Sequence, residues 1–226
     1  MPNITLATLN GIPGVNQAAM TQVNPNACGA YAIVAAGGAH GVFPVNANLA
    51  YASAGPQAVN LNAAVAVADT YLQLSTQVYG VTGILNNAAG VVPVVPELLA
   101  AGNVYNAPAA MAQVALNLGR QVSINVQAAG FIALNVLYPG EQARCVAVVG
   151  AGNVNVAAGV YAAPGALETH VVCVSTGGGL HWLARGSNGD FYDPGDGTLN
   201  NNWNPVNAND PMGLHYTFTG LWMVIR

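Results

Sequence analysis

The sequence predicts an α+β fold, with a helix-rich lobe over residues 1–119 and a strand-rich lobe over residues 120–226, joined in one domain. In the first part, alanine-rich segments with apolar residues at helical spacing are bounded by proline, asparagine and glycine. In the second part, β-branched runs of strand length lie between turn residues. No helix-length crossover separates consecutive runs, so the predicted sheet is antiparallel. Hydrophobic residues make up 53% of the chain, which is enough for a sizeable core.

Four segments of the first lobe carry helix signals. The first begins at Cys28 and is predicted to end at the glycine pair 37–38, because glycine favours helix termination. The longest has Asn60 or Asn62 as its N-cap and Gly80 as its stop. The other two each open with a proline in the first turn, where the missing N–H costs no hydrogen bond. The predicted helices cover residues 28–36, 60–80, 96–101 and 108–118.

Seven segments of the second lobe concentrate β-branched or aromatic residues between turn residues and are predicted as strands. Cys145 and Cys173 lie in two of them, where a thiol within the core is the expected role. A cross-strand disulfide between the two stays open, because the spacing along the chain does not fix their proximity. The predicted strands cover residues 121–127, 131–138, 143–150, 170–176, 179–186, 190–193 and 215–226.

Charge and composition argue against several classes of partner. The net charge of −4 offers no basic face, which argues against nucleic acid and acidic membrane surfaces. No uninterrupted apolar run approaches the roughly 18 residues of a membrane span. Residues 1–14 lack the cationic and apolar regions of a secretory signal. The protein is therefore expected in the cytoplasm, or as cargo of a specialised secretion system.

The chain contains no lysine, and all four of its basic side chains are arginine. Two explanations are open. One is selection against ubiquitin acceptor sites in a protein that works inside a eukaryotic cell. The other is drift in a GC-rich genome.

Cys28 lies between an Asn-Pro-Asn turn and the first predicted helix, a position that favours chemistry at its thiol. A helix N-terminus presents unpaired backbone N–H groups and the positive end of the helix dipole, and both favour the thiolate. A nucleophile also needs a base, a group that orients the base, and donors for the oxyanion. Gln22, six residues earlier, is placed to supply a side-chain amide donor beside the backbone N–H of Cys28.

The segment of residues 179–197 predicts a β-hairpin that brings a base to its orienting group. His181 opens one strand, residues 186–189 form the turn, and Asp193 closes the return strand. The two side chains share one face only if the loop has an odd number of residues, as in a three-residue turn with a bulge. A loop of even length would place them on opposite faces.

Taken together, Gln22, Cys28 at a helix start, His181 before an aromatic residue, and Asp193 within FYDPGDG resemble the papain-like cysteine peptidase superfamily. The resemblance is nearest to the peptidase domains that trim bacteriocin leaders and to effector proteases injected into host cells. It implies that Cys28 attacks, His181 acts as base, Asp193 orients the imidazole and Gln22 serves the oxyanion hole. It also implies a helical lobe packed on an antiparallel sheet or half-barrel, with the site between them.

The expected activity is that of a cysteine peptidase, which hydrolyses an amide bond in a peptide or protein. The sequence predicts no metal, because its histidines and cysteines lack paired ligand spacing. It predicts no cofactor, because residues 146–155 have Asn155 at the third glycine position of a dinucleotide-binding turn. A host-cell protein is an expected target. Tyr31, three residues after the nucleophile, and Trp182, next to the base, are the candidate substrate-binding aromatics. Papain-type enzymes commonly have a tryptophan shortly after the cysteine, where this chain reads CGAYA.

Three alternatives stay open at this point. His170 followed by Asn188 also fits the order of base and orienting group, although Tyr-Asp-Pro-Gly after His181 is the more distinctive partner. The same Cys-His-Asp set could deamidate or crosslink glutamine side chains, or cut peptidoglycan peptides. The chain could instead be a non-catalytic binding domain, in which Cys28 is an ordinary buried thiol.

Overall fold

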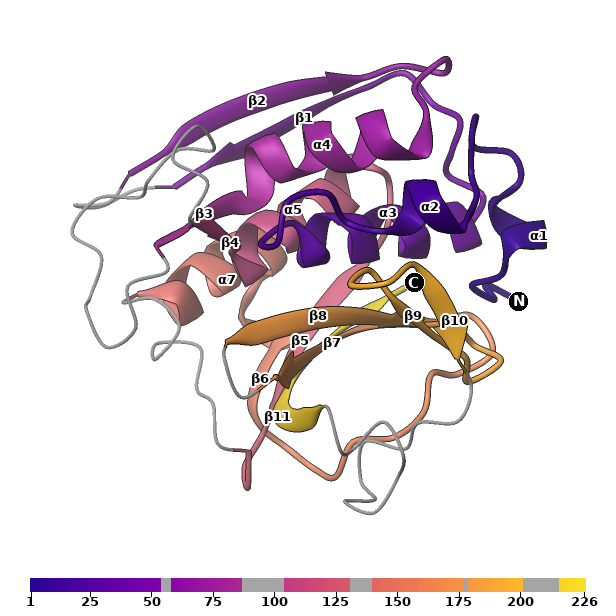
Figure 1. Cartoon of the computed structure of the whole chain (residues 1–226). Coiled ribbons are helices and arrows are strands. Elements are labelled where there is room, and N and C mark those ends of the chain that lie inside the picture. The colour runs from indigo at the N-terminus through magenta and orange to yellow at the C-terminus, as the bar shows by residue number, and fades with distance from the viewer. Residues whose placement is uncertain (54–57, 87–103, 131–139, 177–178, 201–215) are drawn as a thin grey trace.

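The computed structural model describes residues 1–53, 58–86, 104–130, 140–176, 179–200 and 216–226. It is a mixed α/β fold in which helices pack on a sheet of seven strands (Figure 1). A separate two-stranded ribbon, formed by β1, Ala47–Ala52, and β2, Asn60–Val65, covers the other side of the helices (Figure 1). The helices therefore lie between two layers of strands.

The helix α3, Cys28–Ala39, lies at the centre of the molecule and is buried along almost its whole length. It packs against the helix α4, Tyr71–Thr82, on one side and the strand β8, Leu180–Arg185, on the other. The predicted helix at Cys28 is confirmed, but the glycine pair does not end it. A Cβ at Gly37 would lie 2.9 Å from Phe43 Cε2, and one at Gly38 would overlap Leu9 Cδ2. These glycines permit close packing of α3 instead of stopping it.

Two one-turn helices that the sequence did not predict precede α3. They are α1, Leu6–Leu9, and α2, Gln17–Met20. The side chains of Thr5 and Asn16 cap them by accepting backbone N–H groups of the first turn.

Residues 60–80 form a strand and then a helix, so the prediction of one helix is wrong. The strand β2 pairs antiparallel with β1. The helix α4, Tyr71–Thr82, begins after Thr70, whose hydroxyl accepts the Gln73 N–H while Gln73 Oε1 accepts the Thr70 N–H. This capping box sets the helix start, in place of either predicted asparagine. The helix also continues past Gly80.

The helix α5, Pro108–Asn117, confirms the helix predicted at residues 108–118, with its proline in the first turn. Before it, the short strand β3, Gly83–Asn86, pairs antiparallel with β4, Val104–Asn106. The helix predicted at residues 96–101 lies outside the described residues.

The large sheet contains the strands predicted near residues 121, 170, 179, 190 and 215, whereas the segment 131–138 lies outside the described residues. Its strands, in order across the sheet, are β10, Thr198–Asn200; β9, Phe191–Asp193; β8, Leu180–Arg185; β7, Thr169–Ser175; β11, Thr217–Ile225; β5, Val122–Gln127; and β6, Val154–Ala158. Neighbouring strands are antiparallel except for the parallel pair of β5 and β6, so the purely antiparallel prediction is wrong there.

Residues 143–150 are largely helical, and their prediction as a strand is wrong. The helix α7, Glu141–Val149, and the short 3-10 helix η2, Ala151–Asn153, lie in the crossover between the parallel strands β5 and β6. Glu141 and Cys145, one turn apart, are both fully buried. Packing of α7 against α5 outweighs the strand preference of its valines.

The three cysteines, Cys28, Cys145 and Cys173, are free thiols, so the disulfide left open by the sequence does not form. None of the helices in the described part of the chain combines the length and apolar character that crossing a membrane requires.

Candidate active site

Cys28 is the first residue of α3. The turn before it is held by hydrogen bonds from residues far away in the sequence. Asn106 Nδ2 donates to Asn26 O at 2.7 Å, and Thr82 Oγ1 donates to Asn106 Oδ1 at 2.7 Å. The end of α4 and the strand β4 therefore hold the start of α3 in place. No local pattern links Asn106 to this turn, so sequence analysis missed it.

His181 lies on β8 and Asp193 ends β9, and their side chains meet at 2.7 Å between Nε2 and Oδ1. The Gly186 N–H donates to Asp190 O at 3.0 Å, which encloses a three-residue loop whose last residue, Gly189, has a φ of +89°. The loop thus has the odd length that the sequence analysis required, and glycine accommodates its left-handed residue. The two side chains therefore share one face of the hairpin.

The imidazole of His181 interacts with both Cys28 and Asp193. Burial lowers the pKa of His181, but hydrogen bonds to Asp193 and Cys28, together with their charges, raise it to about 10. The exposed fractions are 1% for Cys28, 7% for His181 and 5% for Asp193, so little bulk water screens these contacts. The arrangement favours a protonated imidazole between the Cys28 sulfur and the Asp193 carboxylate.

Asp193 accepts two further hydrogen bonds. The Gly195 N–H donates to Oδ1 at 2.7 Å, and the Tyr216 hydroxyl donates to Oδ2. Burial would raise the pKa of Asp193, but the bonds from His181, Tyr216 and Gly195 lower it below its usual value. The carboxylate therefore stays charged. Tyr216 is not predicted from the sequence, because residues 215–226 show only a strand pattern.

Gln22 lies between the turn before Cys28 and the loop after Asp193. Its backbone N–H donates to Pro194 O at 2.8 Å, and its side-chain Nε2 donates to Pro25 O at 3.0 Å. Gln22 Oε1 is buried and accepts no hydrogen bond from the described residues. Gln22 thus connects the two loops that carry the nucleophile and the carboxylate.

Tyr31 and Trp182 lie in the core. Tyr31 is 1% exposed and packs against Tyr71, with ring centroids 6.0 Å apart. Trp182 is 3% exposed and pairs with Cys173 across β8 and β7. Neither ring is exposed on the surface of this structure, so their contact with substrate stays a prediction.

His170, the rival base, has other partners. Its Nδ1 lies 3.1 Å from the Tyr161 hydroxyl, and its Nε2 lies 3.5 Å from Glu168 Oε2. Burial lowers the pKa of His170 to about 4, against the opposing effect of Glu168. Asn188, its predicted partner, donates to Asp190 Oδ2 at 2.8 Å. These contacts form a second polar cluster.

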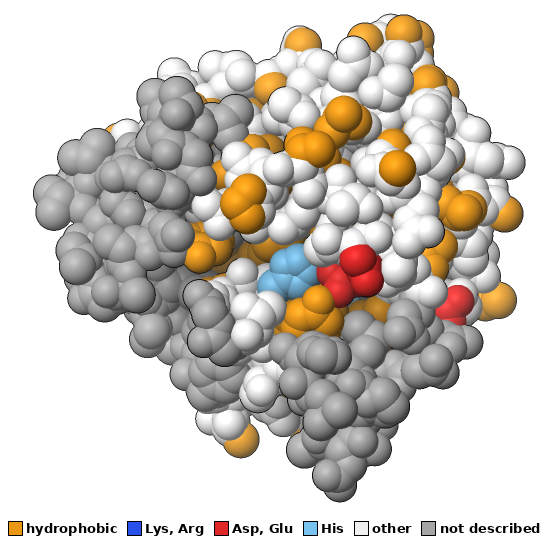
Figure 2. Space-filling view, in the orientation of Figure 1, with side chains coloured by type: hydrophobic (Ala, Val, Ile, Leu, Met, Phe, Trp, Pro, Cys, Tyr) orange, Lys and Arg blue, Asp and Glu red, His pale blue; other side chains and the backbone are white. Residues whose placement is uncertain are grey.

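Figure 2 shows one face of the molecule on which a histidine side chain lies directly beside an acidic one, with hydrophobic side chains next to them. No Lys or Arg side chain is visible among the described residues on this face, in keeping with the net charge of −4. Within the described ranges, no three His, Cys, Asp or Glu side chains cluster closely enough to hold a metal ion.

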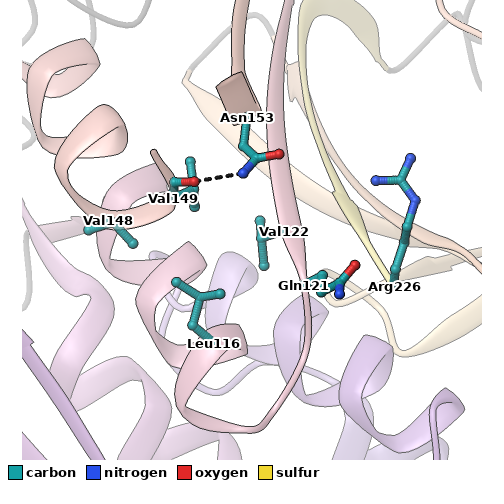
Figure 3. A pocket seen from close by; sticks show the side chains of 7 residues that line it. All are labelled: Leu116, Gln121, Val122, Val148, Val149, Asn153 and Arg226. Atoms are coloured by element: carbon teal, nitrogen blue, oxygen red, sulfur yellow. Dashed lines mark hydrogen bonds between the residues drawn. The ribbon is translucent and has the colours of Figure 1, made fainter. Parts of the chain in front are cut away.

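A pocket of about 410 Å³ lies elsewhere, beside the ends of α5, α7 and β11 (Figure 3). Within it, Asn153 Nδ2 donates to Val149 O at 2.7 Å. Arg226 is its charged lining residue, and the guanidinium binds Glu168 Oε1 at 2.7 Å and 2.8 Å. Among the described lining residues, none is a nucleophile or base for the chemistry considered above. It consists of Leu116, Gln121, Val122, Val148, Val149, Asn153 and Arg226.

A family model described as invasion plasmid antigen J, cysteine protease, matches residues 20–226. The matched range contains Gln22, Cys28, His181 and Asp193. The match confirms the resemblance to effector cysteine proteases that the sequence predicted. No curated protein and no solved structure matches the chain.

Proposed function

The chain belongs to the invasion plasmid antigen J family and is a cysteine protease, and on this premise we propose that Cys28, His181 and Asp193 form its catalytic triad. The observation that carries the proposal is the His181 imidazole held between the Cys28 thiol and Asp193 Oδ1. The proposed reaction is hydrolysis of an amide bond in a peptide or protein. We propose a host-cell protein as the natural target.

The reaction begins with attack of the Cys28 thiolate on the carbonyl carbon of the scissile amide. Because Nε2 of His181 bonds to Asp193 Oδ1, Nδ1 is the ring nitrogen left to hold the Cys28 proton. The tetrahedral intermediate collapses as this proton passes from Nδ1 to the leaving amine, and a thioester forms on Cys28. His181 then takes a proton from water, whose attack on the thioester releases the acid product and regenerates the thiolate.

The oxyanion of the tetrahedral intermediate requires two donors. The backbone N–H of Cys28 is one, because the first residues of a helix have N–H groups without intrahelical partners. The side chain of Gln22 is the proposed second donor. Its Nε2 now donates to Pro25 O, so the substrate oxygen would replace Pro25 as acceptor. The backbone bond from Gln22 to Pro194 O keeps the side chain near the site during this exchange.

The proposal includes a papain-like organisation of one domain across residues 1–226. The nucleophile comes from the start of α3, whereas the base and the carboxylate come from the adjacent strands β8 and β9. In Figure 1, α3 lies directly above β8, and these two elements pack together. A site at the meeting of a helix start and a sheet is what this organisation requires.

Peptide cleavage by matched cysteine variants tests the proposal. Peptides derived from a host-cell lysate are incubated with the wild type, Cys28→Ala or Cys173→Ala, and new N-termini are identified by mass spectrometry. We expect cleavage by the wild type and by Cys173→Ala, whose lost thiol lies on β7 and is fully buried in the core. Equal cleavage by Cys28→Ala would overturn the triad. A second readout is alkylation of Cys28 by iodoacetamide, expected to be faster at neutral pH than that of a free thiol.

A further inference from the structure

Tyr216 contacts both members of the His181 and Asp193 pair. Its ring lies nearly parallel to the imidazole, with centroids 5.7 Å apart and planes inclined by 18°. Its hydroxyl donates to Asp193 Oδ2, whereas His181 bonds to Oδ1. Tyr216 lies just before β11, so it comes from a different part of the chain than β8 and β9, which carry its two partners.

We propose that Tyr216 is a positioning residue for the catalytic pair: its ring covers the hydrogen bond between His181 and Asp193, and its hydroxyl fixes the carboxylate that orients the imidazole. The role in catalysis rests on the function proposed above. The positioning itself can be measured without any substrate.

The hydroxyl acts on the orientation of the carboxylate. Oδ1 of Asp193 is held by His181 and by the Gly195 N–H, both at 2.7 Å. With these bonds alone, the carboxylate could still rotate, because only Oδ1 is held. The bond from Tyr216 to Oδ2 fixes the second oxygen, and a hydrogen bond to a charged acceptor is stronger than one between neutral groups. The fixed plane of the carboxylate orients Oδ1 toward His181 Nε2.

The ring acts on the surroundings of the pair. A stacked tyrosine lays an apolar face over the imidazole and displaces water that would compete for the Nε2–H···Oδ1 bond. It also limits the screening of the charges on His181 and Asp193, which interact more strongly in a water-poor site. The low exposed fractions of both residues, 7% and 5%, agree with this cover.

Among the residues that the structure describes, three other titratable groups face the pair or Tyr216. Cys28 faces His181 from α3, Asp196 faces Tyr216 from the turn after β9, and Tyr192 on β9 faces Asp193. All three remain in a Tyr216 variant. A changed titration of His181 in such a variant therefore reports the loss of Tyr216.

The test is an NMR titration of the labelled full-length protein, in which His181 ring nitrogens and the Asp193 carboxyl carbon are followed. Tyr216→Phe keeps the ring, so Asp193 should titrate at higher pH while His181 changes little. Tyr216→Ala loses ring and hydroxyl, so His181 should titrate at lower pH than in the wild type. For peptide cleavage by Tyr216→Ala, we expect kcat to fall roughly tenfold or more, with KM little changed.

Tyr161→Phe is the matched control, because the Tyr161 hydroxyl lies 3.1 Å from His170 Nδ1 in the second cluster. It should leave the titration of His181 unchanged. A wild-type titration of His181 in Tyr216→Ala, or of Asp193 in Tyr216→Phe, would overturn the inference. If Tyr216→Ala does not fold, the titration of Asp193 in Tyr216→Phe decides whether the inference holds. The proposed triad fails on a separate measurement, namely cleavage by Cys28→Ala.

Discussion

Asn106 and Asn26 are joined by a hydrogen bond of 2.7 Å, which ties the turn before Cys28 to the strand β4. The same Asn106 amide accepts the Thr82 hydroxyl at the end of α4. Asn106 is 1% exposed and Thr82 is fully buried, so water cannot readily replace these partners. The position of the candidate nucleophile thus depends on an amide that takes no part in the proposed chemistry.

Asn106→Ala should lower the free energy of unfolding by about 1–3 kcal/mol, because it removes the donor to Asn26 O and the acceptor of Thr82 Oγ1 in a buried site. Peptide cleavage should fall as well, since the start of α3 loses its anchor. Urea denaturation and a cleavage assay measure the two effects. Asn117→Ala is the control, because it removes a less buried bond of 2.9 Å to Ala50 O. Equal effects in both variants would contradict the anchoring role.

Asp193→Asn should lower the pKa of His181, which is raised to about 10 in the folded protein. An unperturbed histidine titrates near 6.5. The folded protein therefore keeps a proton that the unfolded chain loses between these pH values. This contribution to stability is complete below pH 6.5 and is lost as the pH rises through about 10. In the variant, stability should depend less on pH across that window, and the alkaline limb of kcat/KM should move to lower pH.

Asp190→Asn controls for the loss of a carboxylate in the same hairpin. Asp190 Oδ2 accepts the Asn188 side chain within the loop. This variant should leave the alkaline limb where it is in the wild type. If both variants move the limb equally, the specific pairing of Asp193 with His181 is refuted.

The features that sequence analysis placed correctly depend on local patterns. The start of α3 follows from a turn and an alanine-rich run. The strands β8 and β9 follow from apolar and aromatic residues on either side of a glycine-containing turn. The sequence alone does not decide whether the loop of the His181 hairpin has an odd or an even number of residues. That number depends on where the pairing of β8 with β9 stops. Tyr216 and Asn106 were missed because each reaches the site through tertiary packing.

The wrong assignments have the same origin. The valines of α7 favour a strand locally, yet burial of Glu141 and Cys145 on one helical face decides the structure. In the segment of residues 60–80, the alanine and asparagine residues do not decide between helix and strand. Pairing with β1 selects a strand for its first part. Local propensity is weak in such segments, and tertiary contacts outweigh it.

Glu141→Gln should change how stability depends on pH. Glu141 Oε1 accepts the Ala109 N–H at 2.8 Å, at the start of α5. Burial raises the pKa of Glu141 from 4.5 to about 7, against the lowering effects of the Ala109 N–H and of Arg144. The stabilisation of the fold that comes from the raised pKa of Glu141 is therefore complete below pH 4.5 and is lost as the pH rises through about 7. Relative to the wild type, the neutral variant should gain about 1–3 kcal/mol between pH 5 and pH 8.

For Glu168→Gln, we expect the change in folding stability with pH to have the opposite sign to that of Glu141→Gln. Burial would raise the pKa of Glu168, but the Gly165 N–H and Arg226 lower it. Its contribution is present above pH 4.5 and is lost as the pH falls. The variant should therefore lose stability at neutral pH, by less than about 1 kcal/mol because Arg226 is half exposed. Denaturation series from pH 4 to 9 compare the two variants, and slopes of the same sign would refute the assignment for Glu141.

Gly29→Ala should disturb the site through packing alone. A Cβ at Gly29 would lie 2.7 Å from Asn106 Cβ and 2.9 Å from Met111 Cε. The Met111 side chain can move, but Asn106 is held by its bonds to Asn26 and Thr82. The added methyl must therefore displace the start of α3.

We expect Gly29→Ala to lower the free energy of unfolding by about 1–3 kcal/mol and to slow the alkylation of Cys28. Gly152→Ala is the control, because nothing lies within 4 Å of its Cβ position. Thermal denaturation and alkylation kinetics measure both effects. Overpacking that only destabilised the fold would lower stability and leave the intrinsic alkylation rate of the folded protein at its wild-type value. A slower rate in the folded protein shows that the position of Cys28 depends on the close approach of Gly29 to Asn106.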